Sequence, residues 1–413
     1  MARLLTEQSA DLASRVGAPL EIAGIYVRDM SKEREGIDPA LLTDDADALI
    51  SRADVVVELM GGIEPAKSII LKAIAAGAGV VTANKALLAA HGPELYEAAD
   101  AANVDLYFEA AVAGAIPIIR PVRESLAGDH VRRILGIVNG TTNYVLDEMT
   151  TRGLDYEVAV KQAQDLGYAE ADPSADVDGF DAAAKAAILA SLAFHQRVPL
   201  QDVYREGISA ITAADVAAAT ESGHVIKLLA IAERTGAGDE GGVSVRVHPA
   251  LVPLTHPLAS VHGAYNAVFV EAEAAGELMF YGKGAGGTPT ASAVLGDVVS
   301  VARHIAQGGK GPRESHYGDL PVLPISASSS RFQLRMTVPD RPGVLAAIAA
   351  TFAQSGVSIE TVRQQAGRAG AGLATLAIAT HRAPESDVTA VLEALRTSDA
   401  VTEIRSVLRI EGE

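Results

Sequence analysis

The chain has 413 residues, and its 34 lysines and arginines against 52 aspartates and glutamates give a formal net charge of −18. At roughly 100–200 residues per domain, this length predicts two to four domains. The acidic balance argues against nucleic acid or a membrane surface as a partner, because both bind basic surfaces. The absence of cysteine excludes disulfides and thiolate chemistry and fits a cytoplasmic location. The sequence contains no apolar run of the roughly 18–20 residues that a membrane span needs.

The first third of the chain alternates short apolar runs with helical patterns. The predicted strands cover residues 19–27, 54–59, 79–82 and 104–108. The predicted helices cover residues 4–16, 66–76 and 86–102. Continuous apolar strands separated by helices are typical of βαβ units, so this region is predicted to form a parallel sheet.

The middle of the chain is less regular. Strands are predicted at residues 134–138, 243–247 and 267–273, and helices at 141–152, 155–166, 180–194 and 290–305. Residues 278–287 are dense in glycine and are predicted to form a loop. Residues 316–330 are rich in proline and serine and are interpreted as a linker.

The last 80 or so residues change character and predict a separate small domain. Strands are predicted at 331–338, 357–365, 373–380 and 401–410, helices at 342–354 and 384–395, and a hairpin turn at 368–372. This order is βαββαβ, which is typical of a ferredoxin-like sandwich.

Two segments follow predicted strands of the parallel sheet, at the edge where α/β sheets bind ligands. Lys85 comes just after the strand at 79–82, where an ammonium can meet a phosphate or a nicotinamide carboxamide; the alternative is a solvated lysine that begins a helix. The loop at 108–117 contains small residues and free carbonyls, which suit a hard cation. Its alternative is a tight crossover between domains.

Two polar loops precede predicted helices. Residues 139–144, which begin with Asn139 and include Thr141, offer N–H groups and hydroxyls that could bind an anion or a substrate. Ordinary helix capping explains them equally well. The glycine-rich loop at 281–290 allows backbone N–H groups to approach a cofactor, and it is not a phosphate-binding Walker A sequence.

Acidic residues are densest at residues 166–185. Asp181 and Lys185 are four apart on one predicted helix face, with alanines between them. Glu170 and Asp176 add negative charge nearby. A carboxylate cluster with one lysine suits ammonium binding and proton transfer. The alternative is a capped helix with an exposed ion pair worth only about 0.3–0.5 kcal/mol.

Taken together, these motifs resemble those of homoserine dehydrogenases. The resemblance rests on the sequences at residues 81–85, 139–143, 166–173 and 179–185. Residues 338–345 resemble the corresponding turn of an ACT regulatory domain. The resemblance implies an α/β protein with a Rossmann-like nucleotide-binding domain, an α+β substrate and dimerisation domain, and a ferredoxin-like ACT domain.

The implied domains have definite boundaries. The nucleotide-binding domain is expected at residues 1–115, completed by about 288–310, and the substrate-binding domain at 116–287. A linker at 311–330 then leads to the ACT domain at 331–413. The resemblance implies a small-molecule substrate, and no nucleic-acid or membrane partner is expected. It also implies a homodimer or homotetramer.

The resemblance also implies an activity: the NAD(P)-dependent interconversion of L-aspartate 4-semialdehyde and L-homoserine. This reaction belongs to threonine, methionine and isoleucine biosynthesis, and L-threonine is the expected feedback effector.

The resemblance assigns roles residue by residue. Lys185 is the expected proton donor and acceptor, with Lys85 and Asp181 also catalytic. The expected substrate-binding residues are Glu170, Asp176, Asn139, Thr141 and Lys185. NADP(H) or NAD(H) is expected to contact Lys85, Gly286 and Gly61. A structural sodium ion is expected to bind mostly through backbone oxygens of Glu109, Val112, Gly114 and Ile116.

Arg28 follows the strand predicted at 19–27, where an arginine could bind a 2′-phosphate and favour NADP(H). One departure from the family pattern is large. The family opens with a strand and a Gly-x-Gly-x-x-Gly turn, whereas the first glycine here is Gly17. On this comparison the chain begins at the family's first helix, and we expect weak binding of the dinucleotide.

Two other interpretations compete with an active homoserine dehydrogenase. One is a dehydrogenase remnant that senses an amino acid through its ACT domain, which the missing glycine turn would favour. The other is a reductase of a different small aldehyde. The cluster from Glu170 to Lys185 argues against that second interpretation.

Overall fold

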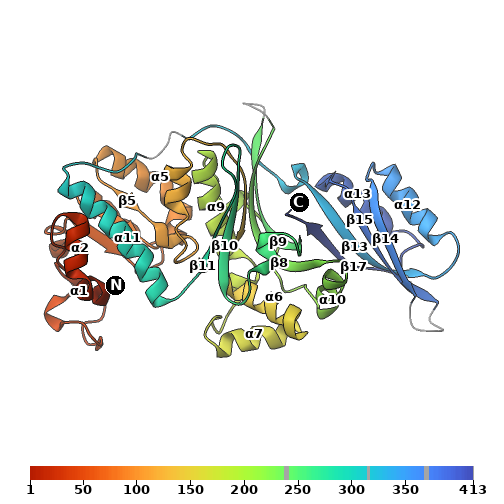
Figure 1. Cartoon of the computed structure of the whole chain (residues 1–413), viewed down its shortest axis with the longest axis horizontal. Helices are drawn as coiled ribbons and strands as arrows, with labels where there is room; N and C mark the ends of the chain where they lie inside the picture. Colours follow the sequence, from red (N-terminus) through yellow and green to blue (C-terminus); the bar gives the residue numbers. More distant parts are fainter. Residues whose placement is uncertain (237–240, 314–316, 367–371, 413) are drawn as a thin grey trace. The chain divides into compact units, whose positions relative to one another are not determined.

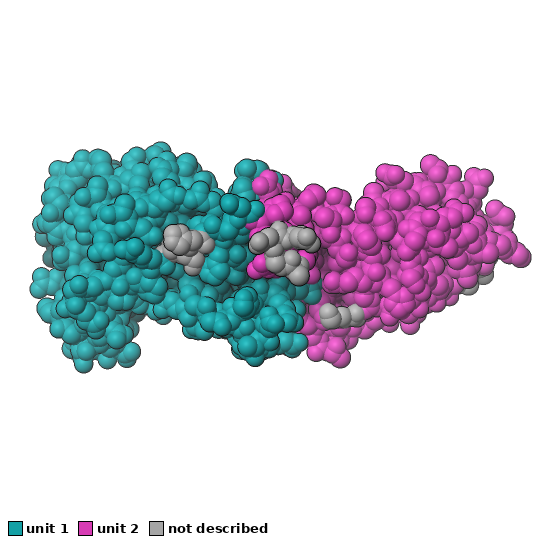
Figure 2. Space-filling view, turned by 90° about the horizontal axis from the view of Figure 1, so that it is seen from above, with its two compact units in different colours: residues 1–134, 184–201, 265–319 teal, residues 135–183, 202–264, 320–413 magenta. Residues whose placement is uncertain are grey.

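The computed structural model describes residues 1–236, 241–313, 317–366 and 372–412 (Figure 1). The chain divides into two compact units, coloured separately in Figure 2. Unit 1 comprises residues 1–134, 184–201 and 265–319, and unit 2 comprises residues 135–183, 202–264 and 320–413. The boundary falls inside β6 (Val131–Ile137), α9 (Phe180–Phe194) and one short turn described below. None of the helices in the described ranges is both long and apolar enough to cross a membrane.

Unit 1 contains the predicted parallel sheet, with its strands in the order β3-β4-β5. The strands are β3 (Val55–Glu58), β4 (Gly79–Thr82) and β5 (Leu106–Tyr107), and the helices between them are α4 (Ala66–Ala75) and α5 (Lys85–Ala101). The long helix α11 (Gly287–Ala306) packs on this sheet, because its valines share one apolar cluster with Val81 and Tyr107. The expected α/β arrangement is confirmed.

The N-terminal segment differs from its prediction. Two helices, α1 (Ala2–Glu7) and α2 (Ser9–Val16), replace the single expected helix. The strand expected over 19–27 is much shorter: β1 (Ile25–Tyr26) pairs in parallel with β2 (Leu42–Thr43) over two residues. A short 3-10 turn, η1 (Pro39–Leu41), precedes β2, and α3 (Ala46–Ile50) follows it. Apolar residues alone therefore overestimate a strand that pairs over so few positions.

The glycine-rich region of unit 1 is also different from its prediction. Residues 276–283 form strand β11 (Gly276–Lys283), antiparallel to β10 (Tyr265–Ala272). The loop predicted over 278–287 is therefore wrong as far as Lys283. The reason is the apolar run from Leu278 to Tyr281, whose residues pair along β10 and outweigh the nearby glycines. Two short turns complete unit 1, η2 (Glu109–Ala111) and the π-helical η3 (Pro121–Ser125).

Unit 2 is built around a long antiparallel pair, β8 (His224–Thr235) and β9 (Gly242–Pro253). β8 was not predicted, and β9 extends well beyond the predicted residues 243–247. The helices of this part are α6 (Gly140–Arg152), α7 (Tyr156–Asp165), α8 (Ser174–Val177) and α10 (Ala213–Glu221). The short elements are η4 (Leu200–Asp202, which crosses the unit boundary), β7 (Tyr204–Arg205), η6 (Pro257–Ser260), β12 (Val322–Leu323) and η7 (Ile325–Ala327).

The C-terminal part of unit 2 has the predicted βαββαβ order. Its elements are β13 (Ser329–Pro339), α12 (Val344–Gln354), β14 (Ile359–Ala366), β15 (Leu373–Thr380), the short β16 (Ala383–Pro384), α13 (Glu385–Arg396) and β17 (Glu403–Ile410). The sheet order is β17-β13-β15-β14, all antiparallel, and both helices share its apolar core. The ferredoxin-like prediction is confirmed. The predicted hairpin turn falls on residues 368–371, outside the described residues, apart from Gly372.

Strand pairing with β9 joins this sheet to the rest of unit 2. β17 pairs in parallel with β9 at Arg409 and Ile410. β12, inside the segment interpreted as a linker, also pairs with β9. That segment is therefore partly structured, because Val322 and Leu323 complete a strand pair.

Candidate active site

The carboxyl ends of β3 and β4 in unit 1 are tied together by a buried carboxylate. One oxygen of Glu58 accepts hydrogen bonds from the backbone N–H groups of Met60 (2.6 Å) and Gly61 (3.2 Å). The other accepts from the hydroxyl of Thr82 at 2.6 Å. Glu58 was not among the predicted site residues, although it ends an apolar run. It fixes the exposed turn that contains the candidate cofactor residue Gly61, where φ is +75°.

Lys85 is the first residue of α5, directly after β4. Asn84 caps this helix, since its side-chain oxygen accepts from the N–H of Leu87 at 3.1 Å. The amide nitrogen of Asn84 donates to the carbonyl of Gly62 at 2.7 Å. The structure thus brings the start of α5 next to the turn at residues 60–62, and it places two of the candidate cofactor residues, Gly61 and Lys85, at one edge of the sheet.

The side chain of Glu109 is occupied by hydrogen bonds from the backbone. Its carboxylate accepts from the N–H groups of Ile118 (2.6 Å), Ile119 (2.7 Å) and Arg120 (3.0 Å). A carboxylate that accepts three N–H groups has little capacity left for a metal ion. The described residues also contain no cluster of three or more acidic or histidine side chains arranged to hold a metal. Any cation at this loop would therefore depend on main-chain oxygens.

The same loop is anchored to α11 by a buried aspartate. Asp297 accepts from the N–H of Glu109 and from the guanidinium of Arg120, both at 2.7 Å. Its side chain is fully buried, and burial raises the pKa of the Asp297 carboxyl to about 6. The sequence signal that we missed was a single carboxylate inside an otherwise apolar stretch of the helix.

The candidate metal loop packs directly against the glycine-rich segment before α11. Ala115 donates its N–H to the carbonyl of Lys283 at 3.1 Å. A Cβ on Gly114 would lie 2.2 Å from the carbonyl oxygen of Gly284, so only glycine fits at position 114. Gly286, the candidate cofactor residue, lies two residues after Gly284 at the N-cap position of α11. The remaining candidates of this loop, Val112 and Ile116, are buried.

Arg28 is exposed and lies two residues after the end of β1. The two-stranded β1-β2 sheet is separate from the β3-β4-β5 sheet. Arg28 therefore does not lie on the sheet that carries Gly61 and Lys85.

In unit 2, the first residue of the 139–143 motif has two roles. The side-chain oxygen of Asn139 accepts from the N–H of Thr142 at 2.9 Å and caps α6. Its amide nitrogen donates to Asp176 at 2.6 Å and to Asp181 at 2.9 Å. The capping alternative is therefore confirmed, and the same side chain also binds two carboxylates of the chain. The structure brings three candidate residues of the substrate site together.

The acidic segment is attached to the same helix. Thr141 donates its hydroxyl to the carbonyl of Tyr168 at 2.7 Å. Glu170 is exposed, and its carboxylate is therefore open to solvent. Asp172 instead accepts from the N–H and hydroxyl of Ser174, and these hydrogen bonds lower the pKa of its carboxyl.

Lys185 lies one helical turn after Asp181 on α9, and both residues are 8% exposed. Ala182, Ala183 and Ala184 separate them, as the sequence analysis described. The i, i+4 spacing predicted from the sequence is confirmed because the helix begins at Phe180. An ammonium and a carboxylate so placed can share or transfer a proton.

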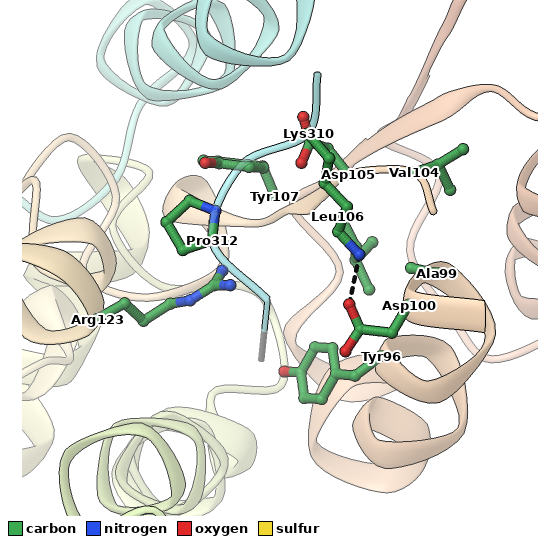
Figure 3. A pocket seen from close by; sticks show the side chains of 10 residues that line it. All are labelled: Tyr96, Ala99, Asp100, Val104, Asp105, Leu106, Tyr107, Arg123, Lys310 and Pro312. Atoms are coloured by element: carbon green, nitrogen blue, oxygen red, sulfur yellow. Dashed lines mark hydrogen bonds and ion pairs between the residues drawn. The ribbon is translucent and has the colours of Figure 1, made fainter. Parts of the chain in front are cut away.

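A small pocket in unit 1 contains none of the candidate residues (Figure 3). Its lining includes Asp100 and Lys310, which form an ion pair, and Tyr107, over whose ring the guanidinium of Arg123 lies at 5.8 Å. Burial raises the pKa of Tyr107 to about 12. These contacts hold the segment after α11 against α5 and β5, so we assign the pocket to packing.

Three parts of the chain match profiles of known protein families. Residues 1–109 match the profile described as homoserine dehydrogenase, NAD binding domain; residues 117–299 match homoserine dehydrogenase; and residues 332–398 match the ACT domain. The chain is thus an oxidoreductase with a nicotinamide-dinucleotide-binding domain and an ACT domain.

Three individual proteins illustrate the similarity. Homoserine dehydrogenase of Corynebacterium glutamicum is 57% identical over 99% of this chain and 92% of that protein. A crystal structure of a homoserine dehydrogenase from Thiobacillus denitrificans is 40% identical, with a TM-score of 0.92, over 99% of this chain and 94% of that one. A hyperthermophilic archaeal homoserine dehydrogenase mutant in complex with NADPH is 28% identical, with a TM-score of 0.56, over 66% of this chain and 77% of that one. The chain belongs to the homoserine dehydrogenase family.

Proposed function

We propose that the chain interconverts L-aspartate 4-semialdehyde and L-homoserine with NADP(H) or NAD(H), and that Lys185 exchanges the proton. The observation that carries this proposal is the pair of hydrogen bonds from Asn139 to Asp176 and Asp181, one turn before Lys185. Together with the family membership, this arrangement provides a lysine and organised carboxylates on neighbouring elements.

The bound nicotinamide would supply or accept the hydride. In the reductive direction, Lys185 donates a proton to the aldehyde oxygen and its charge stabilises the developing alkoxide. Asp181 holds the ammonium in place, and Lys85 orients the cofactor and substrate. In the oxidative direction Lys185 accepts the proton from the hydroxyl group.

The substrate carries an ammonium group as well as the reacting carbon. Glu170 and Asp176 are the carboxylates that would bind this ammonium, with Asn139 and Thr141 shaping the site. The exposure of Glu170 supports its role, because a solvent-facing carboxylate can meet an arriving ligand.

Gly61, Lys85 and Gly286 would contact the cofactor. The relative solved with NADPH favours NADP(H), as does Arg28 if it reaches a 2′-phosphate. A sodium ion would be held by the main-chain oxygens of Glu109, Val112, Gly114 and Ile116. These residues fit a cation only through the backbone, because the Glu109 carboxylate is already hydrogen-bonded.

The ACT domain supports binding of an amino-acid effector. We propose that this effector is L-threonine, because threonine is one end product of the route to threonine, methionine and isoleucine. We further propose a cytoplasmic homodimer or homotetramer. The edge position of β11 in its sheet supports self-association, because this strand carries the half-buried apolar side chains of Leu278, Met279 and Phe280.

The test is a steady-state assay of the purified chain with aspartate semialdehyde and NADPH, in which the rate of NADPH oxidation is measured. Turnover that depends on both substrates supports the proposal. Threonine binding by calorimetry without any turnover would instead support the amino-acid-sensing remnant.

A further inference from the structure

A lysine is buried in the middle of β8 in unit 2. Lys227 is 2% exposed, between Ile226 and Leu228, which are also buried. Burial of an ammonium is unfavourable unless hydrogen bonds compensate for the lost water. Burial accordingly lowers the pKa of Lys227 to about 8. The established activity and the proposed proton transfer leave this residue without a role.

The ammonium of Lys227 joins two other segments. It donates to the side-chain oxygen of Asn143 at 3.0 Å and to the carbonyl of Val261 at 2.6 Å. Asn143 in turn donates to the carbonyls of Val261 (3.2 Å) and Gly263 (2.8 Å). Lys227 and Asn143 therefore hold the loop at 261–263 against α6 and β8.

One further turn along α6 adds the charged groups that face this network. Asp147 accepts from the N–H of Gly263 at 2.7 Å and lies 2.8 Å from the Nδ1 atom of His262. The Asp147 carboxylate favours the charged form of Lys227, which partly opposes the effect of burial on its pKa. The network thus fixes two successive turns of α6.

Asn143 also connects the network to the proposed substrate site. Its N–H donates to the carbonyl of Asn139 at 3.3 Å, in the first turn of α6. Asn139 is the residue whose amide holds Asp176 and Asp181. A shift of Asn143 would therefore move the cap of α6 and, with it, the amide that orders both carboxylates.

We propose that Lys227 is a positioning residue for substrate binding, which acts through Asn143 on Asn139 and so sets the geometry of Asp176 and Asp181. This inference rests on the proposed function of those carboxylates. It explains why an ammonium is buried at a position where an apolar side chain would avoid the loss of hydration.

The cost of burying the Lys227 ammonium depends on pH. Because the pKa of Lys227 in the folded chain is below its usual 10.5, the folded state disfavours the charged form. The resulting penalty is full below about pH 8 and decreases as the pH rises toward 10.5. Lys227→Met removes the penalty together with the hydrogen bonds, so we expect the variant to remain folded.

The experiment compares Lys227→Met with Lys161→Met, a matched change of an exposed lysine on α7. We expect the KM for homoserine to rise about tenfold or more in the first variant, since small misplacements of binding groups have large kinetic effects. The Kd for NADPH, measured by calorimetric titration, should stay close to that of the unchanged chain. Lys161→Met should match the unchanged chain in every measurement. A lysine with only a structural role would lower the Tm and the active fraction without changing KM, and that result would overturn the inference.

Three more variants complete the test. If Lys227→Met does not fold, Lys227→Arg decides, because it keeps the charge while displacing the donors; an unchanged KM would reject the proposal. Asn139→Ala and the double variant with Lys227→Met should show the same KM, whereas additive effects would contradict action through Asn139. An inactive unchanged chain would overturn the proposed function and this inference together, and an active chain with an unaffected Lys227→Met would overturn the inference alone.

Discussion

The amide of Asn139 shows how one side chain can have a structural and a chemical role. Its oxygen caps α6, and its nitrogen donates to two carboxylates that lie 37 and 42 residues further along the chain. Capping uses only the oxygen, so it does not explain the two hydrogen bonds of the nitrogen. The other half determines where Asp176 and Asp181 point, and this is why we give Asn139 a place in the substrate site.

Lys185→Ala tests the proposed proton transfer. Loss of a general acid and base should reduce kcat by about 10²–10⁴-fold, because the alkoxide then lacks both its proton source and the nearby positive charge. Circular dichroism should show little change in folding. Lys161→Ala, on the exposed surface of α7, is the control and should keep normal turnover. Near-normal turnover of Lys185→Ala would refute the assignment.

Asp297→Asn tests the anchor between α11 and the Glu109 loop. The pKa of Asp297 in the folded chain, about 6, is above its usual value of 3.8. The stability contributed by its protonated form is therefore full below about pH 3.8 and is lost as the pH rises through 6. The free energy of unfolding of the unchanged chain, relative to the variant, should accordingly decrease between pH 4 and pH 7 in urea denaturation.

The exposed Asp44→Asn provides the control for this titration. A difference between the unchanged chain and Asp297→Asn that does not vary with pH would show that Asp297 stays ionised throughout.

At the scale of single elements, local patterns predicted most helices and short buried strands. β4 and α9 begin and end at the predicted residues, because continuous apolar runs and repeated alanines determine their type. β8 was missed and β11 was read as a loop. Both strands pair antiparallel with a strand that neighbours them in the sequence, and this pairing stabilises them more than the periodicity within either strand indicates.

The hydrogen bonds of the candidate site also could not be predicted from local sequence patterns. The candidates Asn139, Asp176 and Asp181 could be named from residue type and resemblance, but their hydrogen bonds depend on tertiary packing. Glu58 and Asp297 were missed because a single carboxylate in an apolar run gives no sign of the backbone N–H groups that it binds. Lys227 gave a similar signal, a lone charge within an apolar strand.

Gly114→Ala tests the close packing of the two loops in unit 1. The added methyl group would meet the carbonyl of Gly284, and φ at this position is +61°, which alanine rarely adopts. We expect the free energy of unfolding to fall by about 1–3 kcal/mol, and the affinity for NADPH to fall with it. Gly309→Ala, where the methyl group meets open space, is the control. Equal stability and affinity of the two variants would show that the loops do not need this contact.

At the scale of the whole molecule, the strand pairs of the ACT domain continue into the rest of unit 2. β17 of the ACT domain pairs with β9, and next to this junction the fully buried Arg246 lies 3.1 Å from Glu233 and 3.2 Å from Glu411. Removal of the ACT domain would leave Arg246 without Glu411 and expose an edge of β9. Truncation therefore changes more than effector binding, and a point substitution in the full chain is the sharper experiment.

Asp340→Ala is that substitution. Asp340 lies in the turn between β13 and α12, where its carboxylate accepts from Gln364 at 3.4 Å and its N–H donates to the carbonyl of Gly372. If this turn binds L-threonine, loss of a charged hydrogen-bond partner worth about 1.5–3 kcal/mol should raise the inhibitory threonine concentration by about ten- to a hundredfold. Turnover without threonine should be unchanged, because the junction around Arg246 stays intact. Asp387→Ala, a half-buried carboxylate on α13, is the control in inhibition curves of the full chain. Unaltered inhibition of Asp340→Ala would place the threonine site elsewhere.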